Sequence, residues 1–590
     1  MQCFTNVCER GLGTVEDGNK YGHGTHVAGI AAANLDGVGT TGVAPDADLL
    51  IGKLAYDSGF FQFNKIPDAM EWAVNNGADV VNISAGTRPS GSYKNSLTEI
   101  SEGVYYSNMT FGDYNTLGYN QIFSTNGHGT AMIESMKGHE TVMVLASGND
   151  RLKVSSQESH IALDSEIGDR VLVVGMYDER RKGLSKWSNA AGTICRELDG
   201  DGTCKSDALI SDRYIIAPGV YIAAPTNNGE YTTMTGTSMA APHVAGAVAI
   251  VHQMWPHMTG ANVSQLLLNT ASTDEINNYD PNVHGQGMLD LDEATQPQGA
   301  MGLATTGRID GATVDLANSG AIAMSGNTNI SALSSIMAVD EYDRDYYFDA
   351  NGMVNTIDTR TASATLAGQH GFAPDYYIGY NGGSIIPVSN AGTHIALNDT
   401  NGNVSIVQQW DKFSMGLVNE SESFLGNYAN SELMKVDGSN TAYVGFTDSI
   451  DFNNGINMWG SATLGATRLN VDNSSMLKSA DIMMSNSATL GIKQTVDNET
   501  FGFVASLPVS ITSGNANFSI PTSVSSTGDI SNTNMNSSLE MDNRELDLGL
   551  FYINTLTEST SFTDNIELRN NYSGTSDNHV TAGLTYKVTF

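Results

Sequence analysis

One short segment constrains the fold of this chain more than any other. Residues 235–246, TGTSMAAPHVAG, place Ser238 among small residues and directly before an apolar run. The run predicts a helix that begins at Ser238 and points its free N–H groups and positive dipole end at the serine. We expect Pro242 to fall early in this helix, where a missing N–H group costs least. Because a serine hydroxyl is a weak nucleophile, the segment predicts a base nearby.

Residues 22–29, GHGTHVAG, supply the candidate base and open a second helix of small residues. Together with the serine segment, they closely resemble the signatures of the subtilisin-like serine proteases. The resemblance implies a serine-type endopeptidase that cleaves proteins or peptides, with His23 as general base and Ser238 as nucleophile. His26 and His243 take no part in the chemistry of that family, and we expect them to be structural.

Two further segments extend the resemblance. Residues 142–150, VMVLASGND, predict a buried strand and match the family segment whose asparagine, here Asn149, stabilises the oxyanion. Residues 80–86, VVNISAG, match the strand that pairs with the substrate backbone beside the first specificity pocket, although Ala85 is smaller than the residue often found there. The resemblance implies six substrate-binding residues: Ser84, Ala85, Gly86, Ala146, Ser147 and Gly148.

A second His-Gly-Thr sequence occupies residues 128–130 but lacks the residues that follow in the first. It ends a long polar stretch, residues 87–127, which predicts an insertion near the cleft. We interpret the repeated tripeptide as a coincidence, with a role at the rim of the cleft as the alternative.

The third member of a subtilisin-type triad is an aspartate that lies roughly thirty residues before the histidine. Only twenty-two residues precede His23, and none of them forms an apolar strand that ends in Asp-Thr-Gly or Asp-Ser-Gly. Asp17 is a possible substitute, but it belongs to the polar loop before the helix. We therefore expect a truncated chain without the triad aspartate, the first strand or a signal peptide. Since loss of that aspartate lowers kcat by ~3 × 10⁴ in a subtilisin, the alternative function is a catalytically impaired protease with an anchoring or binding role.

Composition limits the partners and the compartment. The formal net charge of −36 argues against nucleic acid, because phosphate contacts need Lys and Arg. The same charge suits a soluble, secreted or salt-tolerant surface, and no apolar run reaches the length of a transmembrane helix. The cysteines fall into two close pairs, Cys3–Cys8 and Cys195–Cys204, which predict two disulfides in an oxidising compartment. Zinc is the alternative, but the spacings match no common zinc pattern.

Catalysis by serine and histidine needs no cofactor. A structural calcium ion is a weaker expectation, since the family often binds one in the loop that here contains Asp36. Residues 199–202, DGDG, are a second possible calcium loop, with a solvated acidic turn as the more common reading of such a sequence.

Strands and helices alternate in the first half of the chain. This order predicts a subtilisin-like α/β catalytic domain over residues 1–296, with a parallel sheet and helices on both faces. The site is expected beyond the carboxyl ends of the strands. The elements expected between the motifs are a strand at 49–54, a helix at 66–75, a strand at 79–83, a helix at 130–137 and a strand at 171–176.

The second half of the chain has a different pattern. Residues 297–390 indicate a linker or light β-structure, and residues 391–590 alternate apolar and polar positions with a period of two, which predicts an all-β domain. Residues 340–345, DEYDRD, resemble a segment of bacterial autotransporter subtilases, and the last residue is aromatic. We therefore favour an antiparallel β-barrel that places the protein at the bacterial outer membrane or cell surface, or leads to its secretion. A soluble β-sandwich is the alternative.

Overall fold

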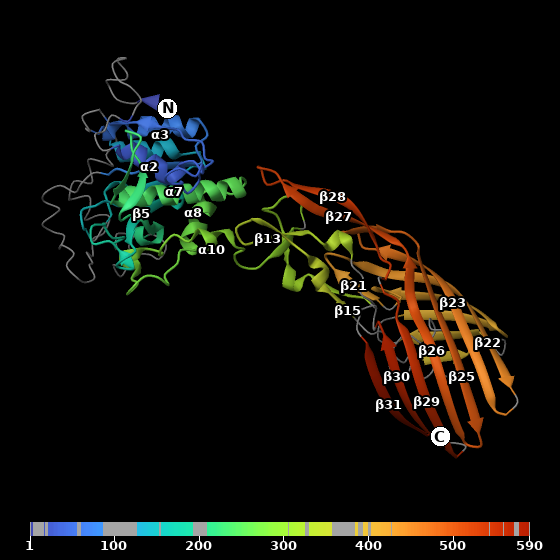
Figure 1. Ribbon diagram of the computed structural model, residues 1–590. Helices are drawn as coiled ribbons and strands as arrows, with labels where there is room; N and C mark the ends of the chain where they lie inside the picture. The colour runs from blue at the N-terminus through green and yellow to red at the C-terminus, as the bar shows by residue number, and fades with distance from the viewer. Residues whose placement is uncertain are drawn as a thin grey trace, which may run out of the picture. The chain divides into compact units, whose positions relative to one another are not determined.

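The computed structural model describes residues 2–3, 17, 22–55, 61–86, 127–152, 155–192, 209–304, 306–324, 330–356, 384–387, 393–398, 403–425, 427–452, 454–541, 543–557, 560–571 and 578–588. The chain forms two compact units (Figure 1). Unit 1 comprises Met1–Gln298 with Tyr342–Arg344, and unit 2 comprises Gly299–Glu341 with Asp345–Phe590.

The core of unit 1 is a sheet whose four main strands, in the order β3, β4, β5 and β7, are parallel. A short strand, β6, pairs antiparallel with the end of β5. All residues of β4 and β5 are buried, as expected for parallel strands that are covered on both faces. The strands span Val80–Ile83 (β3), Val142–Ala146 (β4), Val171–Asp178 (β5), Gly183–Leu184 (β6) and Tyr214–Pro218 (β7).

Helices cover both faces of this sheet, which confirms the predicted α/β architecture. Helix α7 packs across β3, β4, β5 and β7. Helices α3 and α6 pack together and share a core cluster with alternate residues of β4 and β5, so they lie on the other face. The helices span His23–Ala32 (α2), Ile66–Asn75 (α3), His128–Met136 (α6), Thr237–Met254 (α7), Gly260–Asn269 (α8), Pro281–His284 (α9) and Leu291–Thr295 (α10).

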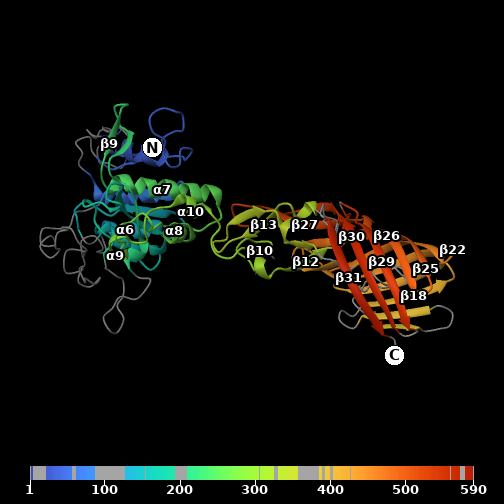
Figure 2. The same cartoon turned by 60° about the horizontal axis from the view of Figure 1, so that its bottom comes forward.

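The predicted helix at 66–75 has the observed bounds of α3, and the helix predicted at 130–137 begins two residues earlier, at His128. The strand predicted at 49–54 is reduced to Gly52–Lys53 (β2), which pairs in parallel with Gln2–Cys3 (β1). Two further strands, Ile222–Pro225 (β8) and Tyr231–Met234 (β9), form a hairpin that projects beyond α7 (Figure 2).

Unit 2 is an all-β structure with short helical turns, as predicted. Residues 299–356 form short strands rather than an extended linker: β10 (Gly302–Ala304), β11 (Thr313–Asp315), β12 (Gly320–Met324), β13 (Ile336–Val339), β14 (Asp345–Phe348) and β15 (Val354–Thr356). These strands form two small sheets, one of which also contains β20 (Ser423–Phe424) and β21 (Asn427–Ser431). A third small sheet contains β24 (Leu477–Ala480), β27 (Asn515–Val524) and β28 (Ile530–Ser538).

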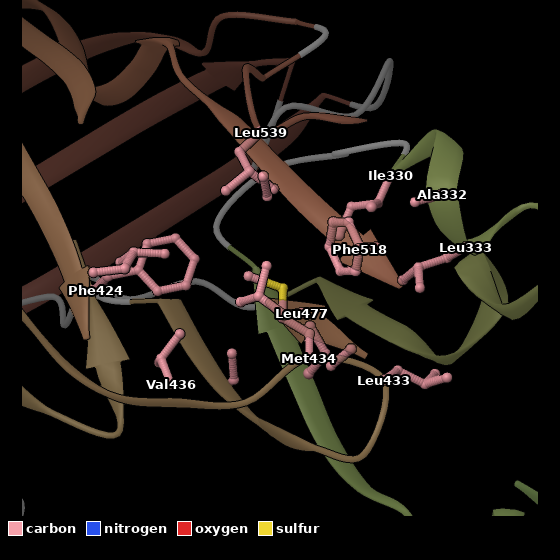
Figure 3. Packing of buried hydrophobic residues seen from close by; sticks show 14 of the residues in the cluster. Ile330, Ala332, Leu333, Phe424, Leu433, Met434, Val436, Leu477, Phe518 and Leu539 are labelled. Atoms are coloured by element: carbon pink, nitrogen blue, oxygen red, sulfur yellow. The ribbon is translucent and has the colours of Figure 1, made fainter. Parts of the chain in front are cut away.

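A buried apolar cluster joins the small sheets (Figure 3). Ile330 and Leu333, from the segment before β13, pack with Phe518 of β27 and Leu477 of β24. The region for which composition indicates a linker or light β-structure therefore contributes to a hydrophobic core.

The largest element of unit 2 is an antiparallel sheet of eleven strands (Figure 1). Its outer strands, β16 and β31, do not pair with each other in the part of the chain that the structure describes, so the predicted closure is not found. The strands, in sheet order, are Ser384–Pro387 (β16), Thr393–Asn398 (β17), Asn403–Trp410 (β18), Phe413–Ser421 (β19), Val436–Phe452 (β22), Ile456–Val471 (β23), Met483–Val496 (β25), Glu499–Ser513 (β26), Leu546–Thr557 (β29), Thr560–Asn570 (β30) and His579–Val588 (β31).

None of the helices within the described ranges is long and apolar enough to cross a membrane.

Candidate active site

The candidate nucleophile lies at the N-terminus of the longest helix of unit 1. Helix α7 begins at Thr237, one residue earlier than predicted, so Ser238 is its second residue. The Ser238 hydroxyl donates a hydrogen bond to the backbone oxygen of Ser84 at 3.0 Å, and the Ser84 hydroxyl donates to the backbone oxygen of Ser238 at 3.0 Å. The two serines are thus bonded reciprocally, and β3 leads directly to the start of α7.

Pro242 explains why the backbone oxygen of Ser238 accepts the hydrogen bond from the Ser84 hydroxyl. It is the sixth residue of α7, so the expectation that it falls where a missing N–H group costs least is wrong. In a regular helix the N–H of this position would bond to the backbone oxygen of Ser238, and proline has none. The Ser84 hydroxyl takes that place, and Asn82 Nδ2 in turn donates to the Ser84 hydroxyl at 3.0 Å. The side chains of β3 therefore stabilise the irregular first turns of α7.

The candidate base lies at the start of another helix. His23 is the first residue of α2, and Gly22 before it adopts a left-handed conformation with φ 60°. Asp17 caps this helix, because its Oδ2 accepts hydrogen bonds from the Thr25 backbone N–H at 2.9 Å and hydroxyl at 3.0 Å. Asn227 Nδ2 holds the backbone oxygen of Asp17 at 2.6 Å.

His23, Asn149 and Ser238 line one cleft of about 670 Å³. The remaining wall of the cleft comes mainly from residues 226–236, which contain the turn of the β8–β9 hairpin and the approach to α7. Burial, the largest effect, lowers the pKa of His23; the negative charge of Asp17 raises it, and His26 lowers it. The imidazole is consequently neutral, and able to accept a proton, over a wider pH range than an exposed histidine.

Asn149 lies beside the nucleophile with its amide group oriented by hydrogen bonds. Its Oδ1 accepts the Thr237 backbone N–H at 2.9 Å and the Thr237 hydroxyl at 3.2 Å. With Oδ1 engaged in this way, Nδ2 is the atom that can donate. The amide lies against Gly236, where an added Cβ atom would be 3.4 Å from Nδ2 and 3.5 Å from Oδ1. The geometry suits an amide that donates to an oxyanion above the start of α7.

Asn189 is a functional residue that the sequence interpretation missed. It is fully buried, and its Oδ1 accepts the backbone N–H groups of Asp150 at 2.9 Å and Leu152 at 3.1 Å. Its Nδ2 donates to the backbone oxygen of Ser147 at 3.0 Å, and its own N–H donates to Gly148 at 2.9 Å. Asn189 therefore fixes the loop that carries Asn149. No spacing or periodicity marks such a residue, because its partners lie about forty positions earlier in the chain.

The predicted substrate-binding residues come together at one edge of the sheet. Ile83 pairs with Leu145 in the parallel ladder between β3 and β4, so the residues that follow these strands leave the sheet side by side. Ser84 and Ala85 are partly buried and Gly86 is exposed, whereas Ala146 and Ser147 are buried. The structure thus brings the segment after β3 to Ser238, which Ser84 contacts directly. The segment after β4 meets the neighbouring residue, because the Gly148 N–H donates to the Thr237 hydroxyl at 3.2 Å.

The other histidines named from the sequence have different surroundings. His26 is buried and lies 3.2 Å from the backbone oxygen of Thr232 through Nε2. His243 Nδ1 lies 2.8 Å from the backbone oxygen of Met239 within α7. His128, from the second His-Gly-Thr sequence, lies 3.3 Å from a carboxylate oxygen of Glu158.

No predicted metal or disulfide site can be built from the described residues. Asp36 is exposed, and its carboxylate accepts the Val38 N–H at 2.9 Å as part of its own turn. The described ranges contain no group of three or more His, Cys, Asp or Glu side chains that could hold a metal ion. Residues 87–126 and 199–202, together with Cys8, Cys195 and Cys204, lie outside the described residues, and only the backbone of Cys3 is described.

Comparison with known proteins places this geometry in a family. The model of the Subtilase family matches residues 8–292. Subtilisin DY of Bacillus licheniformis is 31% identical over 280 residues, which cover 48% of this chain and 79% of that protein. Subtilisin Savinase of Lederbergia lenta is 29% identical over 284 residues, which cover 48% of this chain and 80% of that protein.

Among solved structures, a cold adapted subtilisin-like serine proteinase aligns with 20% identity and a TM-score of 0.32, covering 49% of this chain and 79% of the other. The family model matches the first half of the sequence, and subtilisin DY is 31% identical over a stretch that covers 48% of the chain. The chain belongs to the subtilase family.

Proposed function

We propose that this chain is a serine endopeptidase in which Ser238 attacks the peptide bond, His23 moves the proton and Asn149 stabilises the oxyanion. One observation carries the proposal: the three side chains line the same cleft, with Ser238 at a helix N-terminus and Asn149 hydrogen-bonded to that terminus. Family membership gives the reaction class, because subtilases are serine proteases.

The steps follow from the donors and acceptors in the cleft. The substrate backbone pairs with the segment after β3, which brings its carbonyl carbon to Ser238. The hydroxyl proton passes to His23 as the Ser238 oxygen forms its bond to that carbon. Asn149 Nδ2 and a backbone N–H at the start of α7 donate to the oxyanion. The C–N bond then breaks as His23 returns the proton to the amine, and water releases the acid in a second cycle of the same groups.

Asp17 supplies negative charge near the imidazole. It raises the pKa of His23, which means that it favours the imidazolium form that His23 adopts after taking the serine proton. Its carboxylate is held by Thr25 at the start of α2. In this proposal Asp17 acts through its charge and through the position of α2.

The pH dependence of the reaction tests this electrostatic arrangement. The neutral imidazole is the base, so kcat/KM rises with pH through the pKa of His23. Burial lowers that pKa, and we expect the midpoint of the acidic limb to lie below 6.5. Asp17→Asn removes the charge that raises the pKa and should move the midpoint to still lower pH. A kcat/KM profile from pH 4 to 9 measures both; a midpoint at or above 6.5, or a shift towards higher pH in the variant, would contradict the arrangement.

Fluorophosphonate labelling of the full chain tests the catalytic proposal directly. These reagents react with a serine hydroxyl only when a base and an oxyanion site activate it. Labelling that maps to Ser238 supports the proposal. A folded chain that incorporates no label would favour the alternative, a protease fold that anchors or binds without catalysis.

We further propose that the eleven-stranded sheet anchors the chain in a lipid bilayer, as in export or display at a bacterial outer membrane. Its two faces support this, because their polarity is the reverse of that in a water-soluble sheet. In β19, for example, Phe413, Met415 and Leu417 are exposed while the residues between them are partly or fully buried. The same face of the neighbouring strands exposes further apolar side chains: Val444, Phe446, Leu464, Leu490, Ile492, Phe501, Phe503, Leu550 and Ile566.

The opposite face of the sheet is largely buried and carries many polar side chains, beside a small apolar cluster of Trp459, Val504 and Phe551. Thr441 and Thr467 share a hydrogen bond of 2.8 Å, and Glu567 and Arg569 form a buried ion pair at 3.2 Å. Other buried polar side chains on the long strands are Ser405, Thr463, Ser485, Ser487 and Asp547. An apolar outer face over a polar inner face is the arrangement expected of strands that cross a membrane.

Aromatic pairs lie near one end of the exposed face. Phe413 pairs with Phe446 next to the β18–β19 turn, with ring centroids 5.2 Å apart. Phe501 pairs with Tyr552 near the β25–β26 turn, with centroids 4.7 Å apart. Both turns lie at the same end of the sheet, because alternate turns of an antiparallel sheet do. Aromatic side chains concentrate where a membrane meets water.

We assign residues 1–296 to the peptidase, 297–390 to a junction and 391–590 to the anchor.

Membrane fractionation with two arginine variants tests the anchor. Leu550 lies inside β29 and Leu556 lies next to its end, and both are exposed. An arginine costs ~2–4 kcal/mol at the middle of a bilayer and ~0–1 kcal/mol near its surface. We expect the full chain to remain in the membrane pellet after an alkaline wash, Leu550→Arg to reduce that fraction strongly, and Leu556→Arg to change it little. Recovery of the wild-type chain in the supernatant, or equal effects of the two variants, would exclude the anchor.

A further inference from the structure

A short segment from the second half of the sequence belongs to the peptidase unit. The chain leaves unit 1 after Gln298 and returns to it for Tyr342–Arg344, whereas the residues on both sides of this segment belong to unit 2. Arg344 is fully buried and is among the largest buried side chains of the described residues. The segment lies within residues 340–345, DEYDRD, to which the catalytic proposal gives no role.

Two backbone oxygens at the end of a helix hold the guanidinium group of Arg344. Its Nη1 donates to the backbone oxygen of Ala294, and its Nη2 donates to that of Gln296 at 2.8 Å. Helix α10 ends at Thr295, so these carbonyl groups belong to the end of the helix, where the helix itself supplies no N–H partner. The planar fork of a guanidinium can bond to both oxygens at once, whereas the ammonium group of a lysine is a single compact charge.

Two aromatic rings lie close to the same guanidinium group. Its central carbon is 4.6 Å from the centroid of the Trp255 ring and 5.8 Å from that of the Tyr342 ring. Trp255 directly follows the last residue of α7 and is buried. Both distances lie within the range of cation–π attraction, which is stronger at sites without water. Aromatic rings and a pair of carbonyl oxygens together make a pocket that favours arginine.

The hydroxyl group of Tyr342 is bonded to the end of α8. Asn269 Nδ2 donates to it at 2.7 Å. Gln265, one turn earlier in α8, donates to Asn269 Oδ1 at 2.6 Å, which orients the amide so that Nδ2 points to the tyrosine. Helix α8 therefore presents an oriented donor to the segment.

The backbone between Tyr342 and Arg344 turns sharply. Asp343 has a φ of 60°, in the left-handed region that aspartate enters more readily than most residues. Its backbone oxygen lies 2.7 Å from Nε2 of His257, in the loop between α7 and α8. Since the side chains on both sides of this turn also contact unit 1, all three residues of the segment take part in the contact.

We propose that the peptidase unit has a second peptide-binding site, distinct from the cleft, which recognises the sequence Tyr-Asp-Arg and whose ligand is Tyr342–Arg344 of the same chain. None of the residues that contact the segment lines the cleft. Because residues 299–341 connect the two parts of unit 1 by a separate covalent path, the site keeps the peptidase bound to the rest of the chain after a cut in the first residues of that path. The inference does not depend on the catalytic role of Ser238.

A cut between Ala300 and Met301 tests the site in the full chain. Ala300 is exposed, so a recognition sequence for a site-specific endopeptidase can be inserted after it. The chain also carries Ser238→Ala, to prevent self-digestion, and is cut in detergent after it has folded. We expect the two pieces to elute together in size-exclusion chromatography. Separation of the pieces directly after the cut would overturn the proposal.

Arg344→Lys tests the pocket in the cut chain. Lysine keeps the positive charge but loses the fork, and the loss of one hydrogen bond to a charged group should speed the release of the peptidase piece by on the order of 10-fold. Arg308→Lys is the matched control, because Arg308 is exposed and pairs at the surface with Asp310 and Asp529. Its release rate should equal that of the parent chain. A rate in Arg344→Lys no higher than in Arg308→Lys would contradict the proposed role of Arg344.

A competing peptide gives a test that does not require a variant of the site to fold. An excess of the synthetic peptide of residues 339–346, VDEYDRDY, should release the peptidase piece from the cut chain. The same peptide with citrulline in place of arginine has nearly the same shape but no positive charge, and it should leave the two pieces together. Release by both peptides, or by neither, would show that Arg344 is not what the site recognises.

Discussion

Ser238→Ala should abolish fluorophosphonate labelling of the full chain and reduce peptide cleavage to the background rate. In a subtilisin, removing the nucleophile lowers kcat by about 2 × 10⁶-fold, because the remaining groups cannot form the acyl-enzyme. The Ser238 hydroxyl donates a hydrogen bond to the backbone oxygen of Ser84, so alanine removes this bond but leaves the backbone at the start of α7 unchanged. In-gel fluorescence of the labelled chain and cleavage of a quenched peptide measure the two effects.

Ser264→Ala is the matched control for this experiment. Ser264 is a fully buried serine in α8, and it does not line the cleft. It should label as the wild type does. Labelling of Ser238→Ala at the wild-type level would show that another residue reacts and would remove Ser238 from the mechanism.

Asn149→Ala should lower kcat by about 10²–10³-fold, which corresponds to roughly 2.7–4 kcal/mol of transition-state stabilisation. The loss is expected in kcat rather than in KM, because the amide donates to a charge that exists only in the transition state. The substitution also leaves the Thr237 N–H without its acceptor, so a second variant is needed to isolate the donor.

Asn149→Asp supplies that comparison. Aspartate keeps an oxygen that can accept from Thr237 but replaces the Nδ2 donor with a second acceptor, which repels the oxyanion. We expect its kcat to be at least as low as that of Asn149→Ala, with the same thermal stability as the wild type. Steady-state kinetics with a single peptide give both constants. Recovery of wild-type kcat in Asn149→Asp would mean that the asparagine only supports the helix.

The catalytic core could be predicted because its signals are local. Small residues flank Ser238 and His23, each of which opens a helix, and a hydrophobic strand leads to Asn149. Such patterns depend on a few consecutive residues, and the structure brings all three side chains to one cleft. Helix α3 could be predicted for the same reason, because its apolar positions repeat with the period of a helix. These positions pack against one face of the sheet.

The features that sequence reasoning missed depend on contacts between distant segments. Asn189 binds a loop about forty residues earlier, and Glu158 meets His128 thirty residues earlier. No motif marks Asn189 or Glu158. The expectation for Pro242 was wrong because Pro242 is the sixth residue of α7, and the hydroxyl that takes the place of its N–H comes from Ser84, which follows β3. In residues 49–54, the exposed side chains of Leu49 and Leu50 show that apolar composition alone does not make a long strand.

Unit 2 shows the limit of composition. Residues 297–390 are rich in small and polar residues, which indicated a linker or light β-structure, yet Ile330 and Leu333 belong to a core that also contains Leu477 and Phe518. The period of two in the later strands was sufficient to predict β-structure. It did not indicate which face would be exposed, because alternation looks the same in a sheet with an apolar interior and in one with an apolar exterior.

The exposed apolar face of the eleven-stranded sheet also determines how readily the full chain aggregates in aqueous solution. Phe413, Phe446, Leu464, Phe503 and Leu550 are exposed on one face of the sheet, whereas exposed apolar residues on an ordinary protein surface are scattered singly. In dilute buffer such surfaces adhere to one another. The highest concentration at which the full chain stays free of aggregates is therefore set by unit 2 and not by the peptidase. Detergent micelles that cover this face should therefore keep the chain monodisperse during every measurement of the cleft.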